Sequence, residues 1–457
     1  MEELLYYINF AILIYFIGSA IIYTTLLIGS FPTILRFFNI SHYLVASEVM
    51  EAETQLAVTL ITPMYNEREL ALNTILSALK STYKNLYLIV VNDGSTDDSL
   101  EFLQEKFKLE EVPVVVNPII KTKSVKRSFI SSIYPNLMVL DKENGGAGDA
   151  INAGLNACFT PYFFTLDSDS VIDPNAISLV MYEVFTHINP IAIGCGIYVL
   201  NGCDVEDGIV KQSLVPYRYT SGIQANEYLL SHLFNRTGWN SFGGSMSYSG
   251  TGTLFNRQVV LDVGGFDAGN YAQDSEIIMR LQKIMREQPK KYTISFTPAA
   301  AVWTDVPKNL KEFAQQRDKW TRGLLRSVWL NRKLLFNPKY KIQGLFGFPA
   351  YILLEIIAPY VEFTAYFTVS LAYYLGFLDT VSAILYIILA WGFASYLSVA
   401  NTFISIVTFN RYQRLSNVLW MLLLATLEMF GFRQYRVLIS VYGTFHYFFN
   451  RLKGKLL

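Results

Sequence analysis

The chain has 457 residues, 52% of them hydrophobic, and its mean hydropathy is +0.29. Soluble domains average about 45–50% apolar residues, so the excess indicates apolar segments of membrane length. The 37 basic and 37 acidic residues balance, which argues against a nucleic-acid-binding protein with a basic surface, and the spacing of Cys158, Cys195 and Cys203 indicates neither a disulfide framework nor a zinc site.

The first predicted element is an apolar helix over Leu4–Gly29, which is long enough to cross a hydrocarbon core of about 30 Å. The chain starts with two acidic residues, Glu2 and Glu3, whereas a signal peptide needs a basic start, so we expect a retained membrane anchor within residues 1–45. Arg36 follows the helix. The positive-inside tendency therefore predicts an external N-terminus and a cytosolic middle region.

Residues 54–310 show an alternating strand–helix pattern, and we expect them to form a cytosolic α/β domain. Short apolar runs predict strands over residues 56–62, 86–91, 112–116, 137–140 and 163–166, and helical patterns cover residues 67–80 and those from about 97 onward. Pro63 is expected to end the first strand. Such runs indicate a mostly parallel sheet with helices on both faces, whose ligands bind beyond the carboxyl ends of the strands. Asp93 and Asp167 lie just beyond two of these ends, so we expect them to serve one site.

Two segments of this domain are candidates for nucleotide contact. The first spans Asn92–Asp98 and is either a simple strand–turn–helix connector or places Asp93 to accept hydrogen bonds from a nucleotide. The second, Lys142–Ala150, contains three glycines that allow close backbone approach to a phosphate at a helix N-terminus, but it lacks GxGxxG and a Walker lysine. Asn66, after the first strand, either caps the next helix or contacts a ligand.

Carboxylates mark two further motifs. Asp167 and Asp169 can reach one cation from the same side of an extended turn, and we favour a Mg²⁺ or Mn²⁺ site over a plain surface turn. Such a cation would offset charge on a departing diphosphate. Asp274 stands near the start of a predicted helix, where it either caps the helix or removes a proton from an acceptor hydroxyl.

Residues 311–345 are predicted to form interfacial helices that carry the segment Gln316–Trp320. Trp320 is either an interfacial anchor or a platform that stacks on a sugar ring, with Gln316 and its basic neighbours binding hydroxyls and diphosphate. Residues 346–450 form the predicted C-terminal membrane region, with apolar runs over Phe346–Leu375, Val381–Thr408, Val418–Phe432 and Val437–Phe449. The last two runs form either a tight hairpin or helices partly in the interface, giving four or five spans in total.

Three acidic residues lie inside these apolar runs: Glu355, Glu362 and Glu428. Because a charge is costly in a bilayer, they either pair with basic side chains or line a polar conduit, and the sequence does not favour one reading over the other. Pro359, between the first two, is expected to kink its helix.

As a set, and in this order, these motifs resemble those of the membrane-bound, inverting family 2 glycosyltransferases. This family includes cellulose, chitin, hyaluronan and bacterial poly-N-acetylglucosamine synthases. The resemblance extends from Pro63 to the C-terminal apolar runs. It implies a GT-A fold, inserted between an N-terminal transmembrane helix and a C-terminal transmembrane bundle, with a UDP-sugar donor and Mg²⁺ or Mn²⁺.

The resemblance also implies a role for each motif. Asp93 would bind the uridine part of the donor, Asp167 and Asp169 would form the metal and diphosphate site with Asp169 as the direct metal ligand, and Asp274 would be the catalytic base. The remaining donor and acceptor contacts would come from Lys142, Asn144, Gly145, Gly146, Gln316, Lys319 and Trp320. Lys319 replaces the arginine of the family's Gln-x-x-Arg-Trp motif, a loss for which Arg317 or Arg322 can compensate.

The resemblance therefore predicts a multi-pass plasma-membrane enzyme with a cytosolic catalytic domain. It would polymerise sugar from a UDP-sugar onto a growing glycan acceptor, giving a β-linked exopolysaccharide, with a poly-N-acetylglucosamine-like product favoured. Export or accessory proteins are the expected partners, and nucleic acid is not. Two alternatives stay open on the sequence: transfer of one sugar to a lipid-linked acceptor, and a catalytically silent membrane scaffold.

Overall fold

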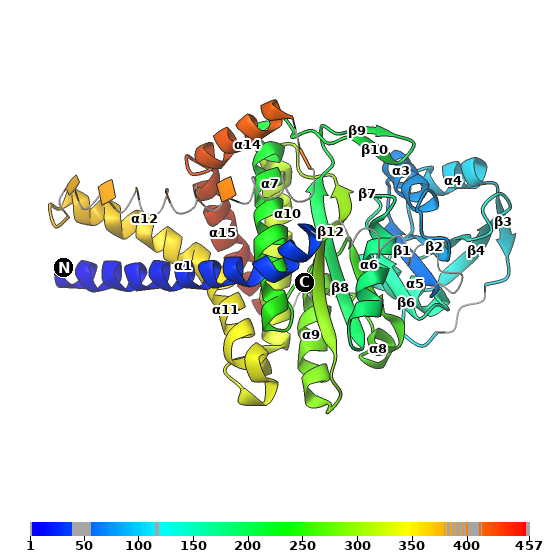
Figure 1. Ribbon diagram of the computed structural model, residues 1–457, viewed down its shortest axis with the longest axis horizontal. Helices are drawn as coiled ribbons and strands as arrows, with labels where there is room; N and C mark the ends of the chain where they lie inside the picture. Colours follow the sequence, from blue (N-terminus) through cyan, green and yellow to red (C-terminus); the bar gives the residue numbers. More distant parts are fainter. Residues whose placement is uncertain are drawn as a thin grey trace.

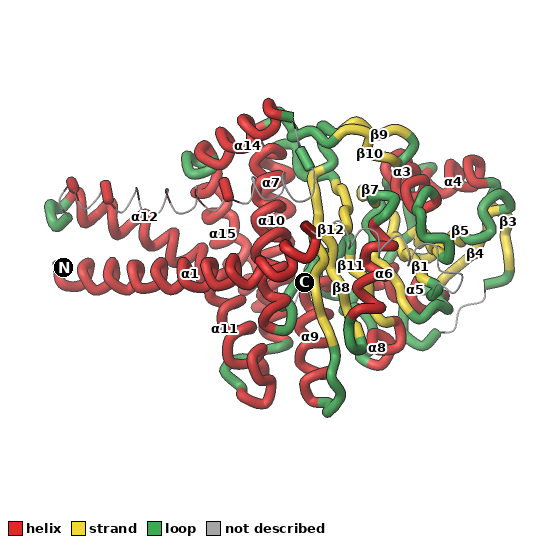
Figure 2. Tube along the Cα trace, viewed as in Figure 1, coloured by secondary structure: helices red, strands yellow, loops and turns green. Residues whose placement is uncertain are grey.

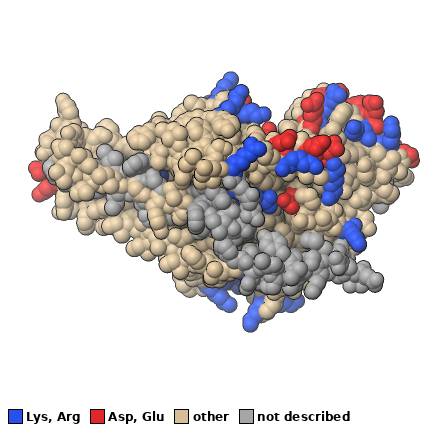
Figure 3. All heavy atoms as spheres, turned by 45° about the horizontal axis from the view of Figure 1, so that its top comes forward, with Lys and Arg blue, Asp and Glu red and all other residues tan. Residues whose placement is uncertain are grey.

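The computed structural model describes residues 2–38, 56–114, 118–378, 411–412 and 414–453, together with scattered residues between 380 and 400. An α/β domain forms one end of the molecule, and long helices project from it at the other (Figure 1). Charged side chains gather on the α/β domain, whereas the helical end shows mostly uncharged atoms on the face drawn in Figure 3. This division matches the predicted separation into a polar domain and a membrane region.

A ten-stranded mixed sheet, in the order β3-β4-β5-β2-β1-β6-β11-β8-β12-β7, is the frame of the α/β domain (Figure 2). The strands are β1 (Val58–Met64), β2 (Leu86–Asn92), β3 (Leu109–Val112), β4 (Val125–Ser131), β5 (Leu137–Lys142), β6 (Tyr162–Thr165), β7 (Ser170–Ile172), β8 (Pro190–Val199), β11 (Thr253–Asn256) and β12 (Thr293–Thr304), while β9 (Asp204–Glu206) and β10 (Ile209–Gln212) form a separate hairpin. Strands β5, β2, β1 and β6 are parallel, as are β8 and β12, and the other pairings are antiparallel. The predicted α/β sheet is therefore confirmed, with its longest parallel part in the run β5-β2-β1-β6 and antiparallel strands added at both sides.

Both faces of the sheet are buried. The helices of the domain are α3 (Arg68–Leu79), α4 (Ser99–Phe107), α5 (Ala147–Ala157), α6 (Ala176–Thr186), α7 (Tyr219–Leu229), α8 (Arg257–Asp262), α9 (Gln273–Glu287) and α10 (Leu310–Leu330). Leu60 of β1 packs in one hydrophobic cluster with residues of α3, α4 and α6, whereas its neighbour Ile61 packs with residues of α5, α8 and α9 on the other face. Successive side chains of a strand point to opposite faces, which explains why the central strands are continuous apolar runs.

Three local predictions are wrong. β1 continues through Pro63 to Met64, because its pairing with β6 ends at Ile61 and the proline lies where that neighbour is absent. The expected strand over residues 112–116 is instead β3, which ends at Val112, and residues 115–116 lie outside the described part. Asn66 does not cap α3: Glu67 is the N-cap residue, and the side-chain oxygen of Asn66 accepts a hydrogen bond from the Thr96 backbone N–H at 2.8 Å.

Among the described residues, two helices are long and apolar enough to span a membrane: Glu2–Arg36 within α1 (Glu2–Phe38), and Gln343–Tyr374. A third candidate is the pair α14 (Leu415–Leu427) and α15 (Phe432–Leu452), which are bent by 58° relative to each other. The expected span over Val381–Thr408 lies largely outside the described residues. The total of four or five spans therefore stays a prediction.

The Gln343–Tyr374 helix is irregular at its membrane entry. It begins with π-helical turns at Gln343–Gly347 and Ile352–Ile357, separated by α11 (Phe348–Tyr351), and continues as α12 (Ala358–Tyr374). Pro359 lies in the first turn of α12. Proline has no N–H to donate, and the wider turn just before it accommodates the missing bond, while the predicted kink of this helix stays a prediction.

Candidate active site

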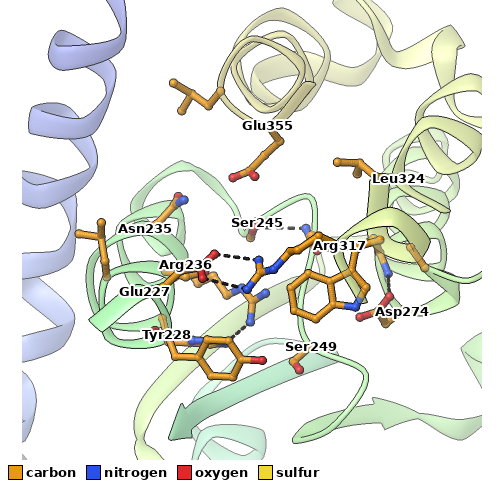
Figure 4. Close-up of a pocket in the computed structure, with 18 of the residues that line it drawn as sticks. Glu227, Tyr228, Asn235, Arg236, Ser245, Ser249, Asp274, Arg317, Leu324 and Glu355 are labelled. Carbon is orange, nitrogen blue, oxygen red and sulfur yellow. Dashed lines mark hydrogen bonds and ion pairs between the residues drawn. The ribbon is translucent and has the colours of Figure 1, made fainter. Parts of the chain in front are cut away.

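A cavity of about 600 Å³ lies between the α/β domain and the membrane helices. Its lining comes from both parts of the chain: Asp167, Asp169, Asp274, Thr304, Gln316, Arg317 and Trp320 on the domain side, and Leu26, Glu355, Glu362, Arg433 and Arg436 on the helical side. Figure 4 shows Glu355 pointing into this space from the membrane helix, with Asp274, Arg317 and Glu227 around it. The structure thus brings three predicted carboxylates, Gln316 and Trp320 to one cavity.

Asp167 and Asp169 lie on the turn after β6. The backbone N–H of Asp167 donates to the Thr251 hydroxyl at 3.2 Å, and β7 pairs with the end of β12, which brings Thr304 to donate to Asp169 Oδ1 at 3.2 Å. Burial, followed by the neighbouring carboxylates, raises the pKa of Asp167. Burial, followed by the charge of Glu67, raises the pKa of Asp169 to about 6. Within the described chain no Lys or Arg forms an ion pair with either aspartate, so the turn carries uncompensated negative charge.

Asp274 stands in the first turn of α9. Ala272 is the N-cap residue, so the alternative that Asp274 caps this helix is wrong. Its Oδ1 accepts a hydrogen bond from the Ser275 backbone N–H at 2.8 Å. Burial raises the pKa of Asp274, and the charge of Arg236 opposes that rise. The carboxylate is therefore held inside the cavity in a setting that brings its pKa closer to neutral pH.

The residues of the Gln316–Trp320 segment point in different directions. Trp320 is 41% exposed and lines the cavity, whereas Lys319 is exposed and does not line it. Arg317 is held by Glu227 through two hydrogen bonds of 2.8 Å, and its guanidinium carbon lies 4.4 Å from the centre of the Trp320 ring. Arg322 pairs with Asp318 at 2.9 Å. Both arginines that were expected to compensate for Lys319 are thus committed to carboxylates.

The predicted donor-binding loop lies beyond the ends of β2 and β5. Lys142 is fully buried, and its Nζ lies 2.6 Å from carboxylate oxygens of both Asp93 and Asp149. The backbone N–H groups of Gly145 and Gly146 donate to the Asp93 carboxylate at 3.0 and 2.7 Å, and the Asn144 side chain donates to the Asp93 carbonyl at 2.8 Å. These five predicted residues are one hydrogen-bonded unit.

This unit, which we call the Asp93 loop, is separate from the cavity. None of its residues lines the cavity, and β2 is separated from β6 by β1 alone. At about 4.8 Å between neighbouring strands, the two strand ends lie on the order of 10 Å apart. Gly94, with φ +69°, keeps the loop close, because a Cβ there would come within 2.8 Å of the Asn144 nitrogen. A nucleotide can extend over this distance, but the structure does not join the two groups directly.

Sequence reasoning singled out the glutamates of the membrane region but missed Glu227 and the basic residues that lie beside them at the inner end of the cavity. Glu362 accepts two hydrogen bonds from Arg433, at 2.8 and 2.7 Å, and Arg436 lies 3.6 Å from Glu428 and 3.4 Å from Glu227. Glu362 and Glu428 therefore pair with basic side chains, which is one of the two alternatives that the sequence left open. Glu355 makes no ion pair or hydrogen bond with any described residue, and it lines the cavity.

Glu67 and Arg236 were also missed as site residues. The Glu67 carboxylate accepts a hydrogen bond from the Ser168 hydroxyl, between the two predicted metal ligands. Arg236 contacts His232 and, like Asp274, lines the cavity. The only sequence signal for Glu67 was its place in the first helical turn after a strand, and no short motif marks Arg236 because its partners lie elsewhere in the chain.

Comparison with known proteins identifies the family that this chain matches. Residues 162–448 match the family described as glycosyl transferase family group 2, and residues 59–264 match glycosyl transferase family 2. A poly-beta-1,6-N-acetyl-D-glucosamine synthase of Staphylococcus aureus is 25% identical over 288 residues, which cover 62% of this chain and 59% of that protein. The synthase of that name from Staphylococcus epidermidis is 27% identical over 290 residues, 63% of this chain and 59% of the relative. The match thus spans about three-fifths of the length of these curated relatives.

A solved structure shares the fold. A mannosyltransferase from Pyrobaculum calidifontis, in complex with GDP-Man and Mn²⁺, superposes with a TM-score of 0.50 at 16% sequence identity, covering 90% of this chain and 97% of that one. At this identity the likeness concerns the fold alone.

Proposed function

Because this chain belongs to glycosyl transferase family group 2 and has the GT-A fold, we propose that it is a membrane-embedded inverting glycosyltransferase that polymerises sugar from a UDP-sugar donor. The product would be a β-linked polysaccharide made at the cytosolic face of the plasma membrane, resembling poly-N-acetylglucosamine as the names of the relatives suggest. A growing glycan is the proposed acceptor, and export or accessory proteins are the proposed partners.

One observation carries this proposal beyond family membership. The cavity that contains Asp167, Asp169 and Asp274 continues without a break to Glu355 and Glu362 of the membrane helix. An enzyme that adds a single sugar needs space only for donor and acceptor ends. Space that leads from the carboxylates into the membrane helices instead suits a product that leaves along it.

The carboxylates after β6 fit a divalent cation. Asp167 and Asp169 are half-buried, with no basic partner among the described residues, and the charge of neighbouring carboxylates adds to the effect of burial in raising their pKa values. No group of three or more acidic, histidine or cysteine side chains converges on one point in the described chain, so a cation would also need oxygens of the donor diphosphate. We propose that Asp169, with Asp167, would hold Mg²⁺ or Mn²⁺, which would supply positive charge to the departing diphosphate.

The donor would extend from these carboxylates to the Asp93 loop. We propose that Asp93 fixes the backbone of Gly145 and Gly146 for the uridine and diphosphate part, through the hydrogen bonds that it accepts from them. Gln316 has a buried side-chain oxygen without a partner in the described chain, so it can accept a hydrogen bond from a sugar hydroxyl. Trp320 would stack on the acceptor sugar. Lys319, whose side chain is exposed outside the cavity, would reach the diphosphate only after a change of side-chain conformation.

Asp274 would carry the proton transfer. Its carboxylate takes the proton of the acceptor hydroxyl while that oxygen forms a bond to the anomeric carbon, and the bond from this carbon to UDP breaks on the opposite face. An α-linked donor thereby gives a β-linkage. The raised pKa of Asp274 makes it a stronger base than an ordinary aspartate.

The test is UDP release by the purified full chain in nanodiscs with Mg²⁺ or Mn²⁺ and a panel of UDP-sugars, followed by sizing of the product. We expect release from one donor, a long product sensitive to a β-glycosidase, and a loss of at least ~10²-fold in the Asp274→Asn variant. A single-sugar adduct on lipid would overturn the polymerase assignment. Absence of both release and donor binding with every UDP-sugar would overturn the enzymatic assignment.

A further inference from the structure

The ends of α10 and α15 meet at an exposed tryptophan that two arginines flank. Trp329, near the end of α10, is 48% exposed. The guanidinium carbon of Arg332 lies 4.6 Å from the centre of its ring, and that of Arg451, from the end of α15, lies 4.7 Å from it. Two cations are thus held at one indole ring, from segments more than a hundred residues apart in the sequence.

No acidic side chain of the described residues compensates the positive charge of this cluster. Lys333 and Lys453 adjoin the two arginines, and all four basic side chains are exposed. In the part of the chain that the structure describes, none of the four forms an ion pair with an acidic side chain. Lys339, only a few residues away, does pair, with Glu287 at 3.0 Å. We call Arg332, Lys333, Arg451 and Lys453, together with Trp329, the Trp329 cluster.

The Trp329 cluster stands at the edge of an apolar surface. The helix α15 packs along α10 (Figures 1 and 2), and its outward side chains are large, apolar and exposed. These outward residues are Leu438, Tyr442, Phe445, Phe448, Phe449 and Leu452. The apolar Gln343–Tyr374 helix begins ten residues after Lys333. A helix with one apolar face and basic residues at its end has the composition of an element that lies in the plane of a membrane surface.

We propose that the Trp329 cluster is a binding site for the headgroups of anionic phospholipids in the leaflet that covers α15. The two unesterified oxygens of a phosphodiester can accept paired N–H hydrogen bonds from a guanidinium, and an indole ring prefers the level of the headgroups. The occupant is a lipid rather than free phosphate, because the charges adjoin the apolar face of α15 and the start of a membrane span, where acyl chains must lie. This inference does not depend on the chemistry proposed for the cavity.

The experiment is thermal unfolding of the purified full chain in a neutral detergent, titrated with phosphatidylglycerol, phosphatidylcholine or inorganic phosphate. A ligand that binds the folded state raises the unfolding midpoint. We expect phosphatidylglycerol to raise it for the wild type. In the variant Arg332→Gln/Arg451→Gln the lipid concentration needed should rise roughly 25-fold, since each basic residue at an anionic surface contributes about fivefold. Added salt should weaken the wild-type response.

Two further variants serve as controls for charge and for donor geometry. Lys339→Gln removes a charge that Glu287 already compensates, so it should respond as the wild type does. Arg332→Lys/Arg451→Lys keeps the charge but loses the planar donors, and should fall between the wild type and the glutamine variant. An equal response of the glutamine variant, an equal effect of phosphatidylcholine, or a response to inorganic phosphate alone would overturn the proposal.

Discussion

At the scale of single residues, the surroundings of Asp274, the proposed base, shift its pKa. Burial raises the pKa of Asp274 and the charge of Arg236 opposes the rise, while Asp167 is a further charged neighbour. A base works in its ionised form, so activity should fall as the pH drops through a pKa above the usual value of about 3.9. We expect Arg236→Gln to move this acid limb to higher pH, and Arg236→Lys to leave it in place. The pH profile of kcat/KM measures this, and an unmoved limb in Arg236→Gln would remove Asp274 from the role.

A second prediction at this scale concerns the role of Arg317 in positioning Trp320. Its planar fork binds Glu227 through two hydrogen bonds and supports the ring of Trp320. Arg317→Lys keeps the charge but loses both features, so Trp320 should be less well positioned against the acceptor. We expect KM for an added oligosaccharide acceptor to rise by about 10- to 10²-fold, with little change in KM for the UDP-sugar.

A matched control for this substitution lies on the same helix. Arg326 pairs with Asp267 at 3.1 Å, and neither residue lines the cavity. Arg326→Lys should leave the acceptor KM close to that of the wild type. Parallel changes of donor and acceptor KM in Arg317→Lys would instead mean a general disturbance of the fold.

At the scale of elements, the Asp93 loop depends on one buried cation. Lys142 is fully buried between Asp93 and Asp149. Lys142→Met would leave two carboxylates buried without an opposite charge, although each still accepts backbone hydrogen bonds, and we expect a loss of about 3–5 kcal/mol in folding free energy. Thermal unfolding in detergent measures this as a lower midpoint. The exposed Lys123, on the neighbouring segment, provides the control: Lys123→Met should change stability by no more than about 0.5 kcal/mol, and an equal loss in both variants would refute the special role of Lys142.

The same scale shows what the sequence could predict. Strands β1, β2, β5 and β6 are buried on both faces, so each is an apolar run that can be recognised alone. β4 (Val125–Ser131) was missed because it lies next to the edge strand β3 and contains the exposed residues Lys126 and Arg127, so it is not a continuous apolar run. The motif residues around Asp93, Asp167 and Asp274 could be found because each follows a strand or opens a helix, whereas the Gln316–Trp320 segment lies inside α10 and was found from its residue types alone.

The inner wall of the cavity could not be predicted in this way. Glu227 pairs with Arg317, which lies 90 positions later in the sequence. It also pairs with Arg436, which lies beyond the undescribed residues of the membrane region. Neither pair forms a pattern within a short window, since each arises only when α7, α10 and α15 pack together. The sequence therefore singled out residues that line the domain side of the cavity and left open how acidic side chains in the membrane region are used.

At the scale of the whole molecule, two glutamates of one membrane helix have different surroundings. Glu362 is paired with Arg433, whereas Glu355 points into the cavity and pairs with no residue that the structure describes. If the cavity is the path of the product, Glu355 acts on the glycan and Glu362 on the fold. Removing each should therefore affect a different measurement.

We expect Glu355→Leu to unfold at the wild-type temperature and to release UDP, but to give shorter chains and less exported polymer, because a hydrogen-bonding group of the path is lost. Glu362→Leu should lower the unfolding midpoint, since Arg433 is left without its partner at a cost of about 3–5 kcal/mol. Unfolding in detergent and product sizing in nanodiscs separate the two effects. Wild-type chain length and export in a well-folded Glu355→Leu protein would show that the product leaves by another route, even if the chemistry at Asp274 is as proposed.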